Sequence, residues 1–153
     1  MGIGGKPHFR GQSLHTLDEK GRLRIPARFR EVLQKHRNDA LVVTMMDGYL
    51  VSYPTETWEK FEEKALELSQ IQPQQREFVR FVISGAVECE FDRQGRILIP
   101  PILREEAGLE REVFLAGMLT NFEIWAKSNW DEQLKRSKAN YRQIAEEIAT
   151  HGL

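Results

Sequence analysis

The sequence predicts an α+β fold built from two tandem copies of one supersecondary unit. The sequence of residues 90–109 is similar to that of residues 16–33. Four residues recur with a displacement of 74 positions, so that Asp18, Gly21, Arg22 and Pro26 correspond to Asp92, Gly95, Arg96 and Pro100. Each copy has the pattern strand, strand, short helix, strand, strand, helix. Because two interlocked copies can bury a core that neither could bury alone, we expect one unit with pseudo-two-fold symmetry.

Each copy begins with two short strands around a tight turn. In the first copy, residues 13–18 and 22–25 are expected to be these strands, with apolar and basic side chains on opposite faces of the second. Asp18 opens a type I turn by capping its backbone, and Gly21 closes the turn with a positive φ. Asp92 and Gly95 repeat this turn in the second copy.

A short helix and a second strand pair follow in each copy. Pro26 and Pro100 suit the first position of a helix, where the missing amide hydrogen costs nothing. We expect the helices over residues 27–33 and 102–107. Apolar, β-rich runs then predict a second hairpin, closed near Gly48 in the first copy and near Asn121 in the second.

Longer helices complete the two copies. Apolar spacing predicts one helix from Trp58 and another from Pro73, which together link the copies. A single amphipathic helix is expected from Ser128, opened by a capping box between Ser128 and Asp131. The predicted organisation is a loose extension over residues 1–8, repeat 1 over 9–55, linking helices over 56–84, repeat 2 over 85–127 and a C-terminal helix over 128–153.

Composition excludes several classes of protein. The chain has 153 residues and a single cysteine, which gives no disulfide framework and no pair of metal ligands. Cys89 is expected in the core. No run of 18 apolar residues occurs, so we expect neither a signal peptide nor a membrane-spanning helix. These features predict a cytoplasmic protein without membrane contact.

Charge is distributed unevenly between the copies although the net charge is only −1. Residues 6–37 contain nine basic and three acidic residues, a balance of +6. Residues 88–112 contain four arginines and seven acidic residues, a balance of −3. The basic first copy favours a polyanionic partner, and the acidic second copy favours contact with a basic or apolar face of another subunit.

The arginines after the two glycine turns are the candidate nucleic-acid contacts. Arg22 projects from the first hairpin, and its guanidinium suits phosphate oxygens and the O6 and N7 edge of guanine. A projecting β-ribbon can enter the major groove. The expected DNA-binding set is Arg22, Lys20, Arg24, Arg10 and Arg96. The alternative is that each arginine only pairs with the turn aspartate or with a helix end of its own copy, which the acidic surroundings favour for Arg96.

Catalytic interpretations have little support in the sequence. Asp18 and Asp92 could share a proton across the pseudo-two-fold axis, but turn capping explains both, and their neighbours differ from those of aspartic protease loops. The four histidines have no ligand spacing. Tyr53 with Trp58, and Trp125 with Trp130, favour core packing over base stacking. No catalytic residue, metal, cofactor or small-molecule substrate is therefore expected.

The two motifs also carry a family resemblance. HFRGQSLHTLDEKGRLRIPARFREVL resembles the opening of the MraZ family of bacterial transcriptional regulators, and FDRQGRILIPPILREEAGL resembles its second copy, with agreement from Phe9 onward. The resemblance implies SpoVT/AbrB-type swapped-hairpin repeats in one β-barrel-like core, with connecting and C-terminal helices. It also implies a closed ring oligomer in the cytoplasm and nucleoid. The ring would bind double-stranded DNA at repeated promoter boxes of the division and cell-wall gene cluster, with Arg22 in contact with the DNA.

Two other hypotheses remain open at this point. One is a non-catalytic, antitoxin-like module that only mediates protein interaction, in which Arg22→Ala leaves the principal activity intact. The other is the carboxylate-dyad enzyme, in which Asp18→Asn abolishes turnover without loss of the fold. The turn-capping interpretation instead expects Asp18→Asn to lower stability.

Overall fold

The structure is a computed structural model that describes residues 8–36, 39–68 and 71–153. The first copy contains β1 (Gln12–Thr16), β2 (Arg22–Arg24), α1 (Ala27–Lys35), β3 (Ala40–Met45) and β4 (Leu50–Pro54). The linking segment contains α2 (Thr55–Ala65), α3 (Pro73–Phe78) and the π-helical turn η2 (Val79–Ile83). The second copy contains β5 (Val87–Glu90), β6 (Arg96–Leu98), α4 (Pro101–Glu106), β7 (Glu112–Gly117) and β8 (Phe122–Ala126), followed by α5 (Lys127–Ala139) and α6 (Tyr141–Ala149). The expected loose extension lies outside the described residues, except for His8.

The strands of the two copies are interleaved. Six strands form an open antiparallel sheet in the order β1-β7-β8-β4-β3-β5, and β2 pairs with β6 in a separate two-stranded ribbon. The first strand of each copy therefore pairs with the other copy, for example through Leu14 opposite Phe114 and Leu41 opposite Cys89. This arrangement confirms the α+β class.

Strand pairing within the first predicted hairpin is limited. Its two strands are joined by the isolated Leu17–Leu23 bridge, by the hydrogen bond from the Asp18 amide to the Arg22 carbonyl, 3.0 Å, and by side-chain bonds of Asp18. The expected hairpin is thus largely replaced by pairing between copies. An isolated hairpin buries little apolar surface, whereas the crossed pairing places Leu23 against Ile97 in a shared core.

The turns and short helices lie close to the predicted positions. Gly21 and Gly95 have φ values of +86° and +75°, as the turn prediction requires. Helix α1 begins at Ala27, as expected, and α4 begins at Pro101, one residue earlier than expected. Pro26 and Pro100 occupy the N-cap position, outside the helices, instead of the first helical position. Their φ values of −56° and −58° suit that position, since the fixed proline ring leads the chain into the first helical turn.

The C-terminal segment differs from its prediction in two ways. It forms two helices, because α5 ends at Ala139 and α6 begins at Tyr141, with Asn140, a weak helix former, between them. The expected capping box is also wrong, since α5 begins at Lys127 and has no side-chain cap. Asp131 instead forms an ion pair with Lys127, with 2.6 Å between the Oδ2 and Nζ atoms.

One hydrophobic core joins both copies. Phe9, Phe29 and Phe122 form an aromatic cluster in it, with ring centroids 4.8–5.3 Å apart. Cys89 is buried in the same core, as expected. A second cluster forms around Trp58 of α2, with Val42 and Val82.

The predicted packing role of the aromatic pairs is also confirmed. Trp58 and Trp125 are buried. The Tyr53 ring lies 5.6 Å from the Trp58 ring, and the Trp125 ring lies 5.6 Å from the Trp130 ring, in both cases between centroids. These rings pack at the junctions between a strand and a helix instead of forming an exposed stacking surface.

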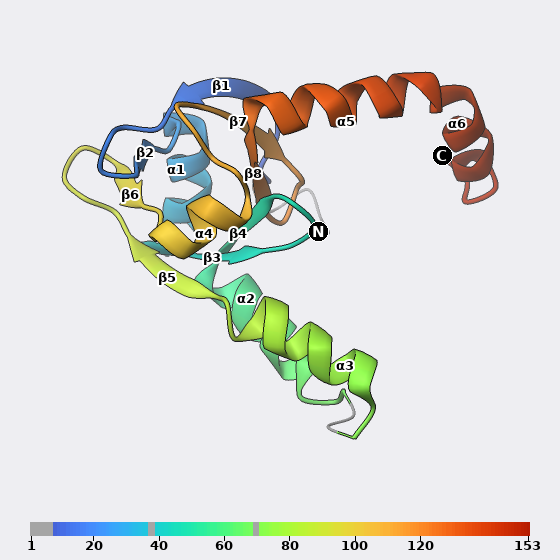
Figure 1. The fold of residues 1–153 in the computed structure, drawn as a ribbon, viewed down its shortest axis with the longest axis horizontal. Coiled ribbons are helices and arrows are strands. Elements are labelled where there is room, and N and C mark those ends of the chain that lie inside the picture. Colours follow the sequence, from blue (N-terminus) through green and yellow to red (C-terminus); the bar gives the residue numbers. More distant parts are fainter. Residues whose placement is uncertain (1–7, 37–38, 69–70) are drawn as a thin grey trace.

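Two helical arms project from the β-rich body. Figure 1 shows α2 and α3 extending in one direction and α5 in another, with α6 folded back at its end. Both arms expose large apolar side chains, namely Leu66, Ile71, Phe78, Phe81, Leu134, Tyr141, Ile144 and Ile148. Within the part of the chain that the structure describes, no helix has the length and apolar character needed to cross a bilayer.

Candidate nucleic-acid interface

The β2–β6 ribbon brings the glycine-turn arginines of both copies to one surface. Its register places Arg22 opposite Leu98, Leu23 opposite Ile97 and Arg24 opposite Arg96. Because side chains alternate along a strand, Leu23 and Ile97 enter the core while the other four face outward. The motif arginines thus share one outer face, although they are 74 positions apart in the sequence.

Asp18 organises the first turn. Its Oδ1 atom accepts hydrogen bonds from the backbone amides of Lys20, at 3.0 Å, and Arg22, at 2.8 Å. Its Oδ2 atom accepts the Nε–H of Arg22 at 2.7 Å. The same carboxylate therefore caps the turn and orients the guanidinium that follows it.

Asp92 repeats these bonds in the second turn. It accepts the amides of Gln94 and Arg96, each at 2.9 Å, and the Nε–H of Arg96 at 2.8 Å. In both turns, the backbone amide of the motif arginine is the main cause that lowers the pKa of the aspartate. Each carboxylate is thus held by the backbone amides and the guanidinium of its own turn, as the turn-capping interpretation expects.

The two motif arginines differ in their electrostatic surroundings. Arg96 pairs with Asp92 and also places its Nη1 atom 4.0 Å from the Oδ2 atom of Asp18. Arg22 has one carboxylate partner, Asp18, among the described residues. The Arg22 side chain is 34% exposed and the Arg96 side chain 23%. Arg22 is therefore the more accessible and less neutralised of the two.

The other three predicted basic residues lie in different places. Arg24 is exposed on the outer face of the ribbon, and Lys20 is exposed in the first turn. Arg10 lies at the opposite end of β1, where the adjoining Gly11 carbonyl accepts a hydrogen bond from the Gly117 amide at 2.9 Å. The structure thus gathers Lys20, Arg22, Arg24 and Arg96 around the ribbon and leaves Arg10 beside the β7–β8 turn.

Two further arginines, absent from the predicted set, contact the turns. Arg104 of α4 lies against Gly21, and Arg30 of α1 lies against Gly95, so each helix supports the turn of the other copy. Each arginine also donates its Nε–H to a carbonyl of its own copy, Arg30 to Ile25 and Arg104 to Ile99. Arg30 and Arg104 are 74 positions apart, the same displacement as the motif residues. This recurrence is the sequence signal that could have identified them.

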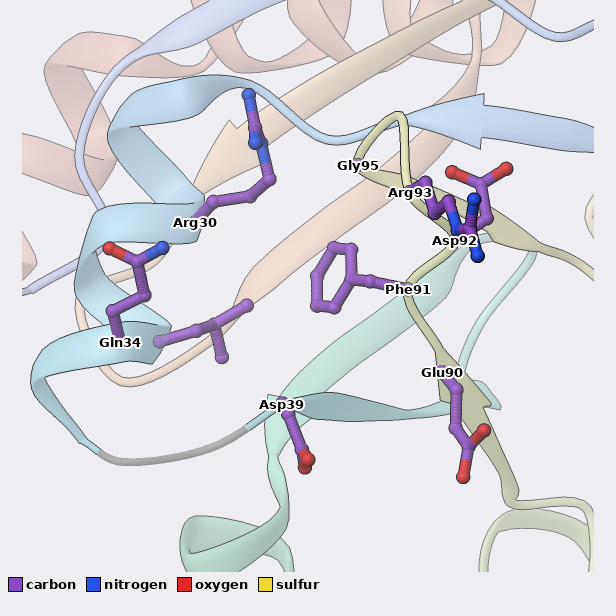
Figure 2. A pocket seen from close by; sticks show the side chains of 9 residues that line it. Arg30, Gln34, Asp39, Glu90, Phe91, Asp92, Arg93 and Gly95 are labelled. Atoms are coloured by element: carbon purple, nitrogen blue, oxygen red, sulfur yellow. The ribbon is translucent and has the colours of Figure 1, made fainter.

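A pocket of about 410 Å³ opens beside the second turn. Figure 2 shows Arg30 and Gln34 of α1 on one side of it, residues 90–95 on the other, and the Phe91 ring between them. Its lining mixes acidic and basic side chains. Among the described residues, no cluster of three or more histidine, cysteine or acidic side chains could hold a metal ion.

The fold and its ribbon define a class of protein, namely a duplicated α+β unit in which two copies present paired arginine turns on one shared surface. A family model described as "MraZ protein, putative antitoxin-like" matches the chain twice, over residues 8–81 and 82–151. The chain belongs to the MraZ family, as its motifs predicted.

Similarity to individual relatives extends over nearly the whole chain. A protein of Syntrophobacter fumaroxidans is 63% identical over 97% of this chain and 99% of its own length. A relative from Pelotomaculum thermopropionicum is 47% identical over 92% of this chain and 94% of its own length. A relative from Oenococcus oeni is 45% identical over 95% of this chain and 99% of its own length. All three are named transcriptional regulator MraZ, so this chain is similar throughout to proteins named as regulators of transcription.

Proposed function

We propose that this chain is a non-enzymatic, sequence-specific transcriptional regulator that binds double-stranded DNA through the outer face of the β2–β6 ribbon. The observation that carries the proposal is the ribbon register, in which Arg22, Arg24 and Arg96 share one exposed face. Lys20 adds a fourth positive charge at the adjoining turn. A two-stranded ribbon fits the width of the major groove, and guanidinium groups there can bond to guanine or to phosphate.

Arg22 is the principal DNA contact in this proposal, and Arg96 is a weaker one. The Asp18 carboxylate holds Arg22 by its Nε atom, and neither Nη nitrogen has a hydrogen-bond partner among the described residues. Those nitrogens remain available for a phosphate or a base edge. Arg96 stands near two carboxylates, so an approaching phosphate has to compete with more negative charge for it.

Assembly strengthens the binding that one ribbon provides. A single subunit offers few phosphate contacts, and such binding weakens steeply as salt concentration rises, by a slope of about 0.9 per phosphate neutralised. Several ribbons joined in a closed ring on repeated promoter boxes gain avidity of roughly 10² to 10⁴. We extend the proposal to such a ring, acting in the nucleoid at the division and cell-wall gene cluster.

The helical arms are the proposed subunit contacts. Helix α2 carries four glutamates and two lysines, whereas α5 carries four basic and two acidic residues. Each arm also exposes apolar side chains, such as Phe81 on the first and Ile144 on the second. Complementary charge together with exposed apolar surface favours docking of the α5–α6 arm of one subunit on the α2–α3 arm of the next. This replaces the expectation that the acidic second motif region makes the contact.

The interleaved strands support the finer description of the fold. We infer that the pairing of β1 with β7, of β5 with β3 and of β2 with β6 represents two SpoVT/AbrB-type swapped hairpins around a barrel-like core. The division into an N-terminal extension, repeat 1, linking helices, repeat 2 and C-terminal segment is retained in this proposal. The two copies then act as one mechanical unit that holds the ribbon rigid.

An antitoxin-like interaction module is the second candidate, and the wording of the family description favours it. In that case the exposed arms, rather than the ribbon, would carry the function. Arg22→Ala would then leave partner binding unchanged, whereas Ile144→Asp on α6 would abolish it. The exposed polar residue Gln143, changed to Asp, is the matched control on the same helix.

A mobility-shift titration tests the proposed function. The probes are duplexes with one, two or three copies of the sequence that the wild-type chain selects from a random pool, each titrated at two salt concentrations. We expect affinity to rise steeply with the number of copies, a large loss for Arg22→Ala and a smaller one for Arg96→Ala. Failure to select any sequence, or equal binding by wild type and Arg22→Ala, contradicts the proposal.

Light scattering tests the proposed assembly. We expect a single oligomer larger than a dimer, whose mass falls for Ile144→Asp and stays constant for Gln143→Asp. If the mass is also unchanged between low and high salt, apolar contacts rather than charge complementarity hold the subunits together. A monomeric wild-type chain contradicts the ring.

A further inference from the structure

The two supporting arginines form a crossed arrangement around the turns. A Cβ atom placed on Gly21 would lie 2.6 Å from the Cζ atom of Arg104, and one placed on Gly95 would lie 2.9 Å from the Cζ atom of Arg30. Both contacts are closer than side chains tolerate, so each guanidinium lies directly against the glycine. The absence of a Cβ atom thus allows the close approach, in addition to the positive φ.

Backbone hydrogen bonds complete the support of the first turn by the second copy. The Ile99 amide donates to the Gly21 carbonyl at 2.9 Å, and the Ile99 carbonyl accepts the Nε–H of Arg104 at 2.9 Å. Gly21 is therefore held by the Ile99 backbone through its carbonyl and by the Arg104 guanidinium over its Cα. Arg22 is the next residue along the chain.

The second turn is held in the same way by the first copy. The Ile25 amide donates to the Gly95 carbonyl at 3.0 Å, and the Ile25 carbonyl accepts the Nε–H of Arg30 at 3.0 Å. Figure 2 shows Arg30 on α1 and Gly95 at the turn that precedes β6. This equivalence provides a matched control within the same chain.

We propose that Arg104, from the acidic second copy, is a positioning residue for the DNA contact that Arg22 of the first copy makes. Asp18 fixes the guanidinium of Arg22, and Arg104 fixes the backbone from which Arg22 projects. A flexible turn would have to be ordered when DNA binds, and that ordering lowers affinity. This inference rests on the proposed function, because it concerns how the ribbon presents Arg22 to DNA.

Arg104→Lys is the variant that separates positioning from charge. Lysine retains the positive charge but lacks the planar guanidinium and its Nε–H donor. If Arg104 acted only through its positive charge near the DNA, the Arg104→Lys variant would bind as tightly as wild type. We expect instead that Arg104→Lys weakens binding to the selected duplex by about tenfold, because an unsupported turn loses its preorganisation.

A double-mutant cycle tests whether Arg104 acts through Arg22. Fluorescence anisotropy gives the Kd of the full-length wild type, of each single variant and of the double variant Arg22→Ala with Arg104→Lys. Because positioning has no effect once Arg22 is gone, we expect the second substitution to weaken binding by less than about twofold in the Arg22→Ala background. Full additivity overturns the inference, and so does a single Arg104→Lys variant with wild-type affinity.

Arg30→Lys is the control for general stability. It removes the equivalent contact from the turn that precedes Arg96, so we expect it to lower Tm as much as Arg104→Lys does. Its effect on the Kd should be less than about threefold, because Arg96 is the weaker contact in the proposed function. Equal losses of DNA affinity for the two variants would show that the Kd follows stability alone, and would overturn the positioning role.

Hydrogen exchange tests the crossed support without DNA. The amides of Gly21 and Arg22 bond within the first turn, and those of Gly95 and Arg96 bond within the second. Arg104→Lys should speed exchange mainly in the first turn, and Arg30→Lys mainly in the second. Faster exchange in the second turn for Arg104→Lys, or in the first turn for Arg30→Lys, overturns the inference. This test needs no DNA, so it remains decisive even if the chain selects no duplex. That failure by itself would refute only the proposed function.

Discussion

Truncation of Leu23 is expected to cost a large part of the stability of the whole chain. Leu23 is 0% exposed and faces Ile97 of the other copy across the ribbon. Leu23→Ala removes three carbon atoms, which corresponds to about 2.4 kcal/mol of lost transfer free energy at about 0.8 kcal/mol per group. Incomplete collapse of the resulting cavity raises the expected loss to about 3–4 kcal/mol.

The measurement is urea unfolding followed by tryptophan fluorescence, with the wild type and variant at equal concentration. In thermal unfolding of a chain of this size, the same loss of free energy corresponds to a fall in Tm of about 10 °C. The m-value should not change, because the same surface is exposed on unfolding. Leu98→Ala is the matched control, since Leu98 lies on the same ribbon but is 55% exposed, and its effect should stay within about 0.5 kcal/mol.

Two outcomes would refute this reasoning. A loss below about 1 kcal/mol for Leu23→Ala would show that the ribbon is not part of the core, because buried leucine truncations cost more than that. Two separate unfolding transitions would show that the copies fold independently, whereas a core shared through Leu23 and Ile97 requires one cooperative transition.

Three further predictions concern single side chains. Burial raises the pKa of the Cys89 thiol to about 11, so a thiol reagent at pH 7 should label the folded chain very slowly and the unfolded chain readily; fast labelling of the native protein would contradict the buried position. The pKa of Asp18 is lowered below 3.8, chiefly by the Arg22 amide, so its stabilising effect is present above that pH and is lost as the pH falls through the folded-state pKa. The Asp18→Asn variant should therefore unfold at a lower urea concentration than wild type at pH 7, and this difference in midpoint should narrow below pH 3.8. A difference in midpoint that does not depend on pH would contradict this. The buried hydroxyl of Ser52 has no hydrogen-bond partner in the described parts of the chain, so Ser52→Ala should raise stability by up to about 1 kcal/mol in urea unfolding, and a clear loss would point to a missing partner.

Features set by local chemistry could be predicted from the sequence. The aspartate, the glycine and the proline of each motif have strong backbone preferences, so the two turns and the starts of the short helices lie within a residue of their expected places. The same holds for the burial of Cys89, which lies in a strand between two exposed residues, Glu88 and Glu90.

Features set by long-range pairing could not be predicted in the same way. The strands of the two copies have similar patterns, and nothing local distinguishes pairing within a copy from pairing between copies. The support of Gly21 by Arg104 depends on that crossed pairing and remained hidden with it. Arg10 is close to Arg22 in the sequence, but β1 carries it to the other end of the sheet.

Salt-dependent binding tests most directly whether DNA binds the ribbon arginines. The Kd for the selected duplex is measured against salt concentration for wild type, Arg22→Ala and Arg10→Ala, which remove the same charge from different places. We expect Arg22→Ala to weaken binding and to lower the salt slope by about 0.9 for each subunit bound, while Arg10→Ala keeps both near the wild-type values. Equal losses of affinity for the two variants, or an unchanged salt slope for Arg22→Ala, would contradict DNA binding through the ribbon.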